Sequence, residues 1–178
     1  MNNDSKMVVF DSSQTIEEIE EVRSDWGRPK GSLFLAGPTP RDGSEGWRPK
    51  ALDILNNLGY NGIVYVPEPF AQGYDKQIGW EWKFLEESSI RLFWIPRELE
   101  KMPAFTTNIE FGHCVISCKE RDNFGTIYGR PDDAPKISYL DWHYKRVAKE
   151  EPYNDLKLML AESVKRLRKL DTMWFIDR

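Results

Sequence analysis

The segment Leu33-Phe34-Leu35-Ala36-Gly37-Pro38 is a short apolar run that stops at a glycine–proline pair. Such a run, closed by residues that break regular structure, is typical of a buried strand. Apolar residues then recur at helical spacing along residues 47–58, and Gly59 stands where the C-terminus of a helix favours glycine. A buried strand followed by an amphipathic helix is the repeating unit of a parallel α/β sheet.

The same alternation continues along the rest of the chain. Its patterns predict strands at residues 63–66, 90–95 and 125–128, a candidate further strand at 136–140, and helices at 75–88, 107–119 and 152–170. Residues 6–10 suit a short edge strand, and residues 15–23 suit a short helix or an exposed arm. The order predicts an α/β, flavodoxin-like doubly wound sheet of about five mainly parallel strands flanked by helices.

Length and composition limit the class of protein. The 178 residues, 40% hydrophobic and 30% charged, favour one globular domain, with residues 1–30 as an N-terminal edge strand or arm and 31–170 as its core. The net charge of -4 disfavours a nucleic acid polymer as partner, and no apolar run suits a membrane span. The cysteine pair and the polar start of the chain lead us to expect a cytoplasmic protein.

Ligands of doubly wound folds bind beyond the carboxyl ends of the strands. The first such loop, residues 37–48, has three glycines that allow close approach of a ligand, and Arg41 and Arg48 suit an anion. The loop matches neither the Walker A pattern nor GxGxxG. A tight connection with solvated arginines is the alternative interpretation.

A second candidate group opens the helix at 75–88. Gln77 and Glu81 are four residues apart and share a helix face, and Trp80 is next to them. An amide, a carboxylate and an aromatic ring can hold a nucleobase, with Trp47 or Trp80 covering it. The alternative is a solvated helix face with one aromatic anchor, because large aromatic residues usually pack inside.

The third candidate is Glu110. Thr107-x-x-Glu110 fits a capping box, in which both side chains satisfy backbone donors at a helix start. A carboxylate in the first helical turn is also favoured in its ionised form by the helix dipole, which lowers its pKa, and an ionised carboxylate can attack a sugar carbon. Both interpretations remain open from the residues alone. His113 and His143 have no partners at metal spacing, so we expect no metal site and no cofactor.

Several of these segments together resemble one family, the nucleoside 2-deoxyribosyltransferase-like proteins. The resemblance covers roughly residues 31–140 and rests on Leu33-Phe34-Leu35-Ala36-Gly37-Pro38-Thr39-Pro40-Arg41, Gln77-Ile78-Gly79-Trp80-Glu81, Leu92-Phe93-Trp94-Ile95-Pro96-Arg97 and Thr107-Asn108-Ile109-Glu110-Phe111-Gly112. Gly129-Arg130-Pro131-Asp132-Asp133-Ala134 and Tyr139-Leu140 are similar in kind.

The resemblance implies a flavodoxin-like fold, a homo-oligomer, and transfer of a 2-deoxyribosyl group between bases through a covalent sugar–glutamate intermediate. Glu110 matches the family's nucleophile and Glu81 its base-contacting acid; Gly37 and Pro38 would face the sugar, and Asn108, within the nucleophile's motif, would contact the substrate. Known transferases carry an aspartate where this chain has Ala104. That role must therefore be lost, moved or supplied by Glu81.

Three alternatives to base transfer remain open. A related branch hydrolyses deoxynucleoside monophosphates, and Arg41 and Arg48 would suit the 5′-phosphate of such a substrate. The same carboxylate chemistry would serve an N-glycosidase that acts on a dinucleotide. A binding module without catalysis would retain only the nucleotide pocket.

Overall fold

The strands of the protein form one parallel sheet, seen in a computed structural model that describes residues 6–24, 31–71, 73–118 and 125–173. The strands are β1 (Val8–Asp11), β2 (Ser32–Ala36), β3 (Ile63–Val66), β4 (Ile90–Trp94) and β5 (Thr126–Gly129). Their order in the sheet is β1-β3-β2-β4-β5, and every neighbouring pair is parallel. The predicted doubly wound, flavodoxin-like sheet is confirmed.

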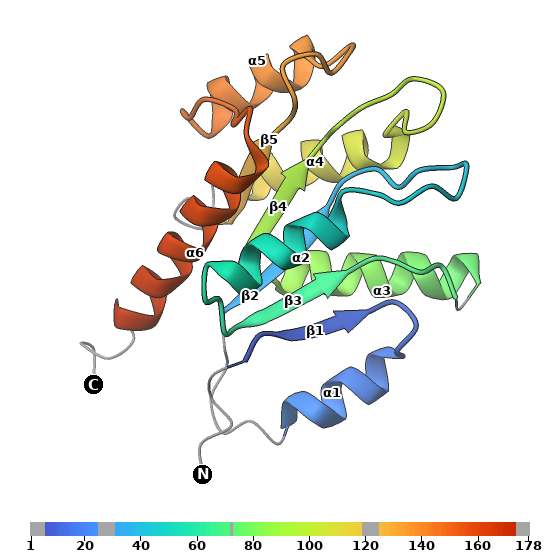
Figure 1. The fold of residues 1–178 in the computed structure, drawn as a ribbon, viewed down its shortest axis with the longest axis vertical. Helices are drawn as coiled ribbons and strands as arrows, with labels where there is room; N and C mark the ends of the chain where they lie inside the picture. The colour runs from blue at the N-terminus through green and yellow to red at the C-terminus, as the bar shows by residue number, and fades with distance from the viewer. Residues whose placement is uncertain (1–5, 25–30, 72, 119–124, 174–178) are drawn as a thin grey trace.

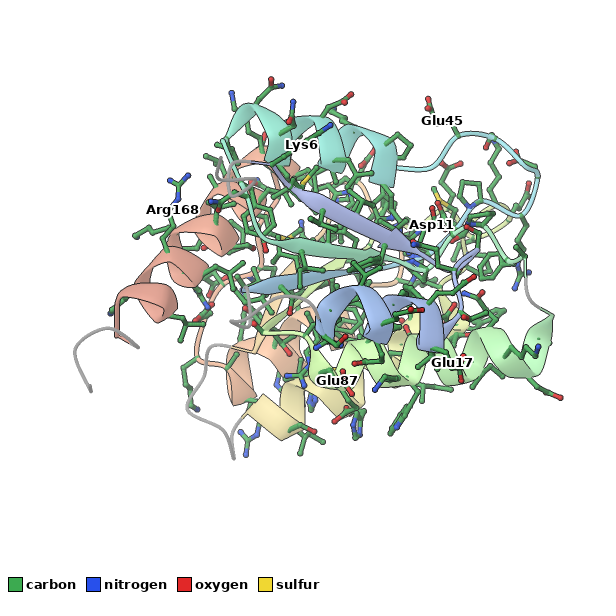
Figure 2. The ribbon with its side chains drawn as sticks, turned by 90° about the horizontal axis from the view of Figure 1, so that it is seen from below. Lys6, Asp11, Glu17, Glu45, Glu87 and Arg168 are labelled. Atoms are coloured by element: carbon green, nitrogen blue, oxygen red, sulfur yellow. The ribbon has the colours of Figure 1, made fainter. Side chains whose placement is uncertain are left out.

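The helices of the described residues cover both faces of this sheet. They are α1 (Ile16–Ser24), α2 (Arg48–Asn57), α3 (Tyr74–Glu87), α4 (Phe105–Cys118), α5 (Ser138–Val147) and α6 (Leu156–Met173). In Figure 1, α2 and α6 lie in front of the sheet and α3 and α4 lie behind it. The turned view in Figure 2 shows the strands between α2 on one side and α1 and α3 on the other.

Alternation along the strands divides the core into two apolar layers. In β2, Leu33 and Leu35 pack with α2 and α6, whereas Phe34 and Ala36 pack with α1, α3, α4 and α5. Successive side chains of a strand point to opposite faces, and both faces are covered here, so the strand is apolar throughout. None of the helices in the described ranges is long and apolar enough to cross a membrane.

Residues 136–140 and 15–23 were the two segments whose local structure was least certain from the sequence. The candidate strand at residues 136–140 is wrong, because α5 begins at Ser138 and buries Leu140 and Tyr144, one turn apart, against the sheet. The segment 15–23 is a helix, and its start is a capping box. There the Thr15 N–H donates to Glu18 Oε2 at 2.7 Å, and the Glu18 N–H donates to Thr15 Oγ1 at 3.2 Å.

The chain reverses its direction of travel across the sheet at β2. From β2 it moves to β3 on one side, and it then crosses to β4 on the other side. The carboxyl ends of β2 and β4 therefore flank the switch point, where doubly wound folds bind their ligands. The loops and helices that follow these strands carry the candidate site.

Candidate active site

Glu110 lies in the second turn of α4, which begins at Phe105 rather than near Thr107. The helix starts early because Ala104 has a left-handed backbone, with φ of 61°, and its carbonyl accepts a hydrogen bond from the Asn108 N–H at 3.0 Å. Thr107 is consequently the third residue of the helix and is buried. The capping-box interpretation of Thr107 and Glu110 is therefore wrong, which leaves the Glu110 carboxylate without a structural role at the helix start.

The carboxyl group of Glu110 is strongly perturbed. Burial, together with the negative charge of Glu81, raises its pKa to about 7, and the positive charge of Arg48 opposes the rise. The sequence led us to expect a helix dipole that favours the ionised form. That expectation is wrong because loss of solvent and repulsion between like charges outweigh the dipole at this position.

Glu81 lies on α3 and forms an internal pair with Gln77. Gln77 Nε2 donates to Glu81 Oε1 at 2.6 Å and to the Pro67 carbonyl at 3.3 Å, so the two side chains share a helix face as predicted. Burial raises the pKa of Glu81, whereas the Gln77 hydrogen bond and the charge of Arg48 lower it. Gln77 is 4% exposed, and among the described residues its Oε1 has no hydrogen-bond partner. A buried acceptor in that state can receive a donor from a ligand.

Arg48 and Arg41 differ in exposure. Arg48, the first residue of α2, is 1% exposed and forms an ion pair with Glu68 at 2.5 Å. Arg41 is exposed; its backbone N–H donates to the Lys101 carbonyl at 3.0 Å, and its guanidinium lies 5.6 Å from the ring centre of Phe105, the first residue of α4. The structure thus places only Arg41 where a solvent-borne anion can reach it. Sequence analysis offered two interpretations of Arg48, contact with an anionic ligand or a solvated side chain in a tight connection. The buried position of Arg48 fits neither of them.

The two candidate tryptophans pack inside the protein. Trp80 is 1% exposed, and its ring lies 4.8 Å from Phe84 and 6.3 Å from Tyr65. Trp47 is 8% exposed and donates from Nε1 to the Pro38 carbonyl at 3.3 Å. Both rings therefore pack inside the protein, as the alternative interpretation of the sequence expected, and do not form an exposed wall for a base.

Gly37 lies where the ends of two strands come close together. A Cβ atom added at Gly37 would be 2.2 Å from the Trp94 carbonyl oxygen, and the residue has φ of 150°. Only glycine fits such an approach. The turn Gly37-Pro38 thus lies against the end of β4, at the switch point.

Asn108 is engaged by a residue that sequence analysis did not single out. Its Oδ1 accepts a hydrogen bond from Arg97 Nη2, and Arg97 Nη1 donates to the Lys136 carbonyl. Arg97 and Glu68 were both missed, although each stands within a few residues of the carboxyl end of a predicted strand. Their position just after a predicted strand was the sequence signal that could have identified these two residues as part of the site. Arg97 joins the loop after β4 to α4 and to the start of α5.

The histidines serve other contacts. His113 Nε2 lies 2.8 Å from Glu86 Oε1, and its ring lies 4.9 Å from that of Trp82, whereas the His143 ring lies near those of Phe111 and Tyr139. Within the described ranges, no group of three or more His, Cys, Asp or Glu side chains could hold a metal ion.

Comparison with known proteins gives one family match. The model of the family described as "Nucleoside 2-deoxyribosyltransferase like" matches residues 30–121, just over half of the 178 residues. The search of curated proteins found no match. The matched region runs from the start of β2 beyond the end of α4 and so contains Gly37, Arg48, Glu81 and Glu110.

Proposed function

Because the chain belongs to the nucleoside 2-deoxyribosyltransferase-like family, we propose that it cleaves the N-glycosidic bond of a deoxynucleoside or deoxynucleotide and transfers the sugar through Glu110. Family membership suggests an enzyme of the glycosyltransferase or N-glycosidase type and a small nucleoside substrate. The observation that carries the proposal is that Glu81 and Glu110, two partly buried carboxyl groups with raised pKa values, lie on the helices near the switch point of the sheet.

The proposed reaction has two steps. In the first, the Glu110 carboxylate forms a bond to C1′ while the bond between C1′ and the base nitrogen breaks. The electron pair of the broken bond goes to the base nitrogen, which takes up a proton. In the second, a nitrogen of another base, or a water molecule, attacks C1′ and releases the Glu110 carboxylate, and the proton of the attacking group goes to Glu81. Glu81, whose pKa is raised by burial, passes a proton to the departing base, while Glu110, with a pKa of about 7, is ionised in part at neutral pH and attacks as the carboxylate.

We assign the substrate contacts of this proposal from the burial and the hydrogen bonds of each candidate residue. Gln77 and Glu81 hold the base, Gln77 through its buried Oε1, which has no hydrogen-bond partner in the part of the chain that the structure describes. Gly37 and Pro38 lie beside the sugar. Asn108, two residues before the nucleophile, contacts the substrate and is held by Arg97. Trp80 and Arg48 do not contact the substrate in this proposal, because both side chains are 1% exposed. Trp47 supports the turn after β2 by donating a hydrogen bond to the Pro38 carbonyl.

Hydrolysis of a deoxynucleoside monophosphate is the second candidate. Arg41 favours it, because this exposed cation lies beside the first residue of α4 and can meet a 5′-phosphate. Ala104, at the position of the family's aspartate, also separates this chain from the well-known transferases. Base release without an added acceptor base would identify hydrolysis, and base exchange would identify transfer.

Mass spectrometry of the intact protein is the direct test of the proposed nucleophile. After exposure to deoxynucleosides and to deoxynucleoside monophosphates, we expect an added mass of one deoxyribosyl or phosphodeoxyribosyl group. Glu110→Gln keeps the size of the side chain but lacks the anionic nucleophile, so the adduct should be lost. Neither adduct nor base release with any member of a panel of deoxynucleosides, monophosphates and free bases would refute the proposal.

We also propose that the protein forms a homo-oligomer through α3 and α4. Both helices expose large apolar side chains, between 47% and 81% exposed: Tyr74, Ile78, Trp82, Phe105, Ile109 and Ile116. The Trp82–His113 ring contact joins the two rows. Together these side chains expose on the order of 700 Å², close to the roughly 800 Å² that each partner buries in a standard interface. A second copy is therefore the occupant that we propose for this surface.

Light scattering after size-exclusion chromatography tests the assembly. We expect a multiple of the 20.9 kDa chain mass and dissociation in Ile109→Glu. Leu158→Glu is the matched control, because Leu158 is 62% exposed on α6, which packs on the other face of the sheet. A monomeric wild-type protein would contradict the proposed interface. A reduced compartment such as the cytoplasm remains a prediction from the cysteine pattern.

A further inference from the structure

Arg48 is a buried cation with an unusual set of partners. Its side chain starts at the first residue of α2 and runs below the turn that follows β2. Burial of an arginine is costly unless its charge and its N–H groups are satisfied. The partners that satisfy Arg48 therefore indicate what the residue does.

The hydrogen bonds of Arg48 hold the end of β2. Nε donates to the Leu35 carbonyl at 2.9 Å, Nη2 to the Gly37 carbonyl at 2.6 Å, and Nη1 to Thr39 Oγ1 at 3.1 Å. Nη1 also donates to Glu68 Oε1 at 2.5 Å, the oxygen that accepts from Thr39 Oγ1 at 2.6 Å. These contacts use most of the donors of a guanidinium. Little donor capacity is left for a substrate phosphate.

The charge of Arg48 acts on three carboxyl groups from three different segments. Glu68 follows β3, Glu81 lies on α3 and Glu110 lies on α4, and each interacts electrostatically with the guanidinium. Arg48 lowers the pKa of Glu81 and of Glu110, against the burial that raises both. Arg48 is therefore a cation whose charge acts on both carboxyl groups of the candidate site.

We infer that Arg48 is a positioning residue, whose buried guanidinium fastens the turn after β2 to Glu68 and supplies the positive charge against which Glu81 and Glu110 are held. This inference rests on the proposed function in assigning chemistry to Glu110. It replaces the expectation that Arg48 contacts an anion of the substrate. The inference predicts the direction in which the pKa of Glu110 moves when the charge of Arg48 is removed. Without the positive charge, Glu110 keeps its proton to a higher pH and is a nucleophile only above that pH.

The test compares neutral and charged replacements of Arg48. Arg48→Met removes both the charge and the donors, Arg48→Gln keeps amide donors without the charge, and Arg48→Lys keeps the charge with fewer donors. Arg91→Met is the matched control. Arg91 is 4% exposed and donates to the backbone carbonyls of Leu85 and Glu86, at the opposite end of the sheet from Glu110.

Two readouts separate this inference from the proposed function. The first is the carboxyl carbon-13 titration of Glu110, identified by its loss in Glu110→Gln, which requires no activity. The second is the pH dependence of kcat/KM for base release. We expect both midpoints to rise by at least about one pH unit in Arg48→Met and Arg48→Gln, which is a tenfold change in the ionised fraction below the midpoint. In Arg48→Lys and Arg91→Met the midpoints should stay near the wild-type value.

The outcomes are distinct. A Glu110 midpoint that is unchanged in a folded Arg48→Met or Arg48→Gln protein overturns the inference, whatever the activity. A shifted midpoint in a protein without any base release supports the inference on Arg48 and refutes the proposed function. A KM increase in Arg48→Lys that is confined to deoxynucleoside monophosphates, with kcat unchanged, also overturns it, because that result would make Arg48 a phosphate ligand.

Discussion

Glu81 raises the pKa of Glu110 across two helices, α3 and α4, that begin beyond the carboxyl ends of different strands. Burial and the negative charge of Glu81 favour the protonated form of Glu110, and the positive charge of Arg48 opposes them. With a pKa of about 7, Glu110 is ionised in part at neutral pH, and burial also raises the pKa of Glu81. A glycosidic reaction needs both an ionised nucleophile and a proton for the leaving base, and this pair can provide both.

Replacement of Glu81 by glutamine should separate these two roles. Glu81→Gln removes the negative charge that raises the pKa of Glu110, so the acid limb of the pH–rate profile should move to lower pH. The maximum rate should nevertheless fall by about 10²–10⁴, because glutamine cannot pass a proton to the base. The pH dependence of base release measures both effects. An acid limb that moves to higher pH would show that Glu81 does not repel Glu110.

Glu110→Gln should make the folded protein more stable at alkaline pH. The pKa of Glu110 is about 7 in the folded state and near 4.5 when unfolded, so ionisation of the folded carboxyl costs stability as the pH rises through this interval. The cost is absent below about pH 4.5 and complete above about pH 7, where it is at most about 3 kcal/mol. Neutral glutamine avoids it. Urea unfolding at about pH 4.5 and about pH 8 measures the difference.

The matched control for this stability measurement is Glu45→Gln. Glu45 projects from the exposed loop between β2 and α2, as Figure 2 shows. Its replacement should leave the dependence of unfolding free energy on pH nearly as in the wild-type protein. If Glu110→Gln and Glu45→Gln behave alike at both pH values, the perturbed pKa of Glu110 is refuted.

Arg41→Ala should distinguish a monophosphate substrate from a nucleoside. Loss of a charge-assisted phosphate contact costs about 1.5–3 kcal/mol, which is roughly a 10- to 150-fold increase in KM for the monophosphate. The KM for the nucleoside should hardly change. Lys101→Ala is a suitable comparison, because Lys101 is exposed and pairs with Asp42 at 3.4 Å in the same region. Equal KM effects on both substrates would argue against a phosphate contact by Arg41.

Much of the fold was predictable because its strands are apolar on both faces and its helices have one apolar face. The segment 63–66 was predicted with the bounds that β3 has. The segment 136–140 failed because an isolated short run with Tyr139 and Leu140 fits a strand and a helix equally well. The helix is favoured by the packing of Leu140 and Tyr144 in the apolar layer that includes Tyr128 of β5, which is a tertiary contact.

The candidate site was predicted less completely than the fold. Spacing alone correctly placed Gln77 and Glu81 on one face of a helix. It could not reveal that Arg48 points inward, because the acceptors of its donors come from the end of β2 and from Glu68 after β3. The sign of the Glu110 pKa shift was missed for the same reason. Burial and the charge of Glu81 are tertiary effects that a local helix dipole does not include.

Gly37→Ala should destabilise the protein strongly, by about 2–4 kcal/mol. The new Cβ would be 2.2 Å from the Trp94 carbonyl oxygen and 2.9 Å from the Trp47 ring, so the ends of β2 and β4 would have to separate. Such a movement would also disturb the Arg48 hydrogen bond to the Gly37 carbonyl. Gly79→Ala is the control, because a Cβ atom at this helical position meets nothing within 4 Å and should stabilise α3 by about 0.5–1 kcal/mol. Thermal and urea unfolding of both variants measure these changes, and a Gly37→Ala protein as stable as the wild type would disprove the close approach of the two strand ends.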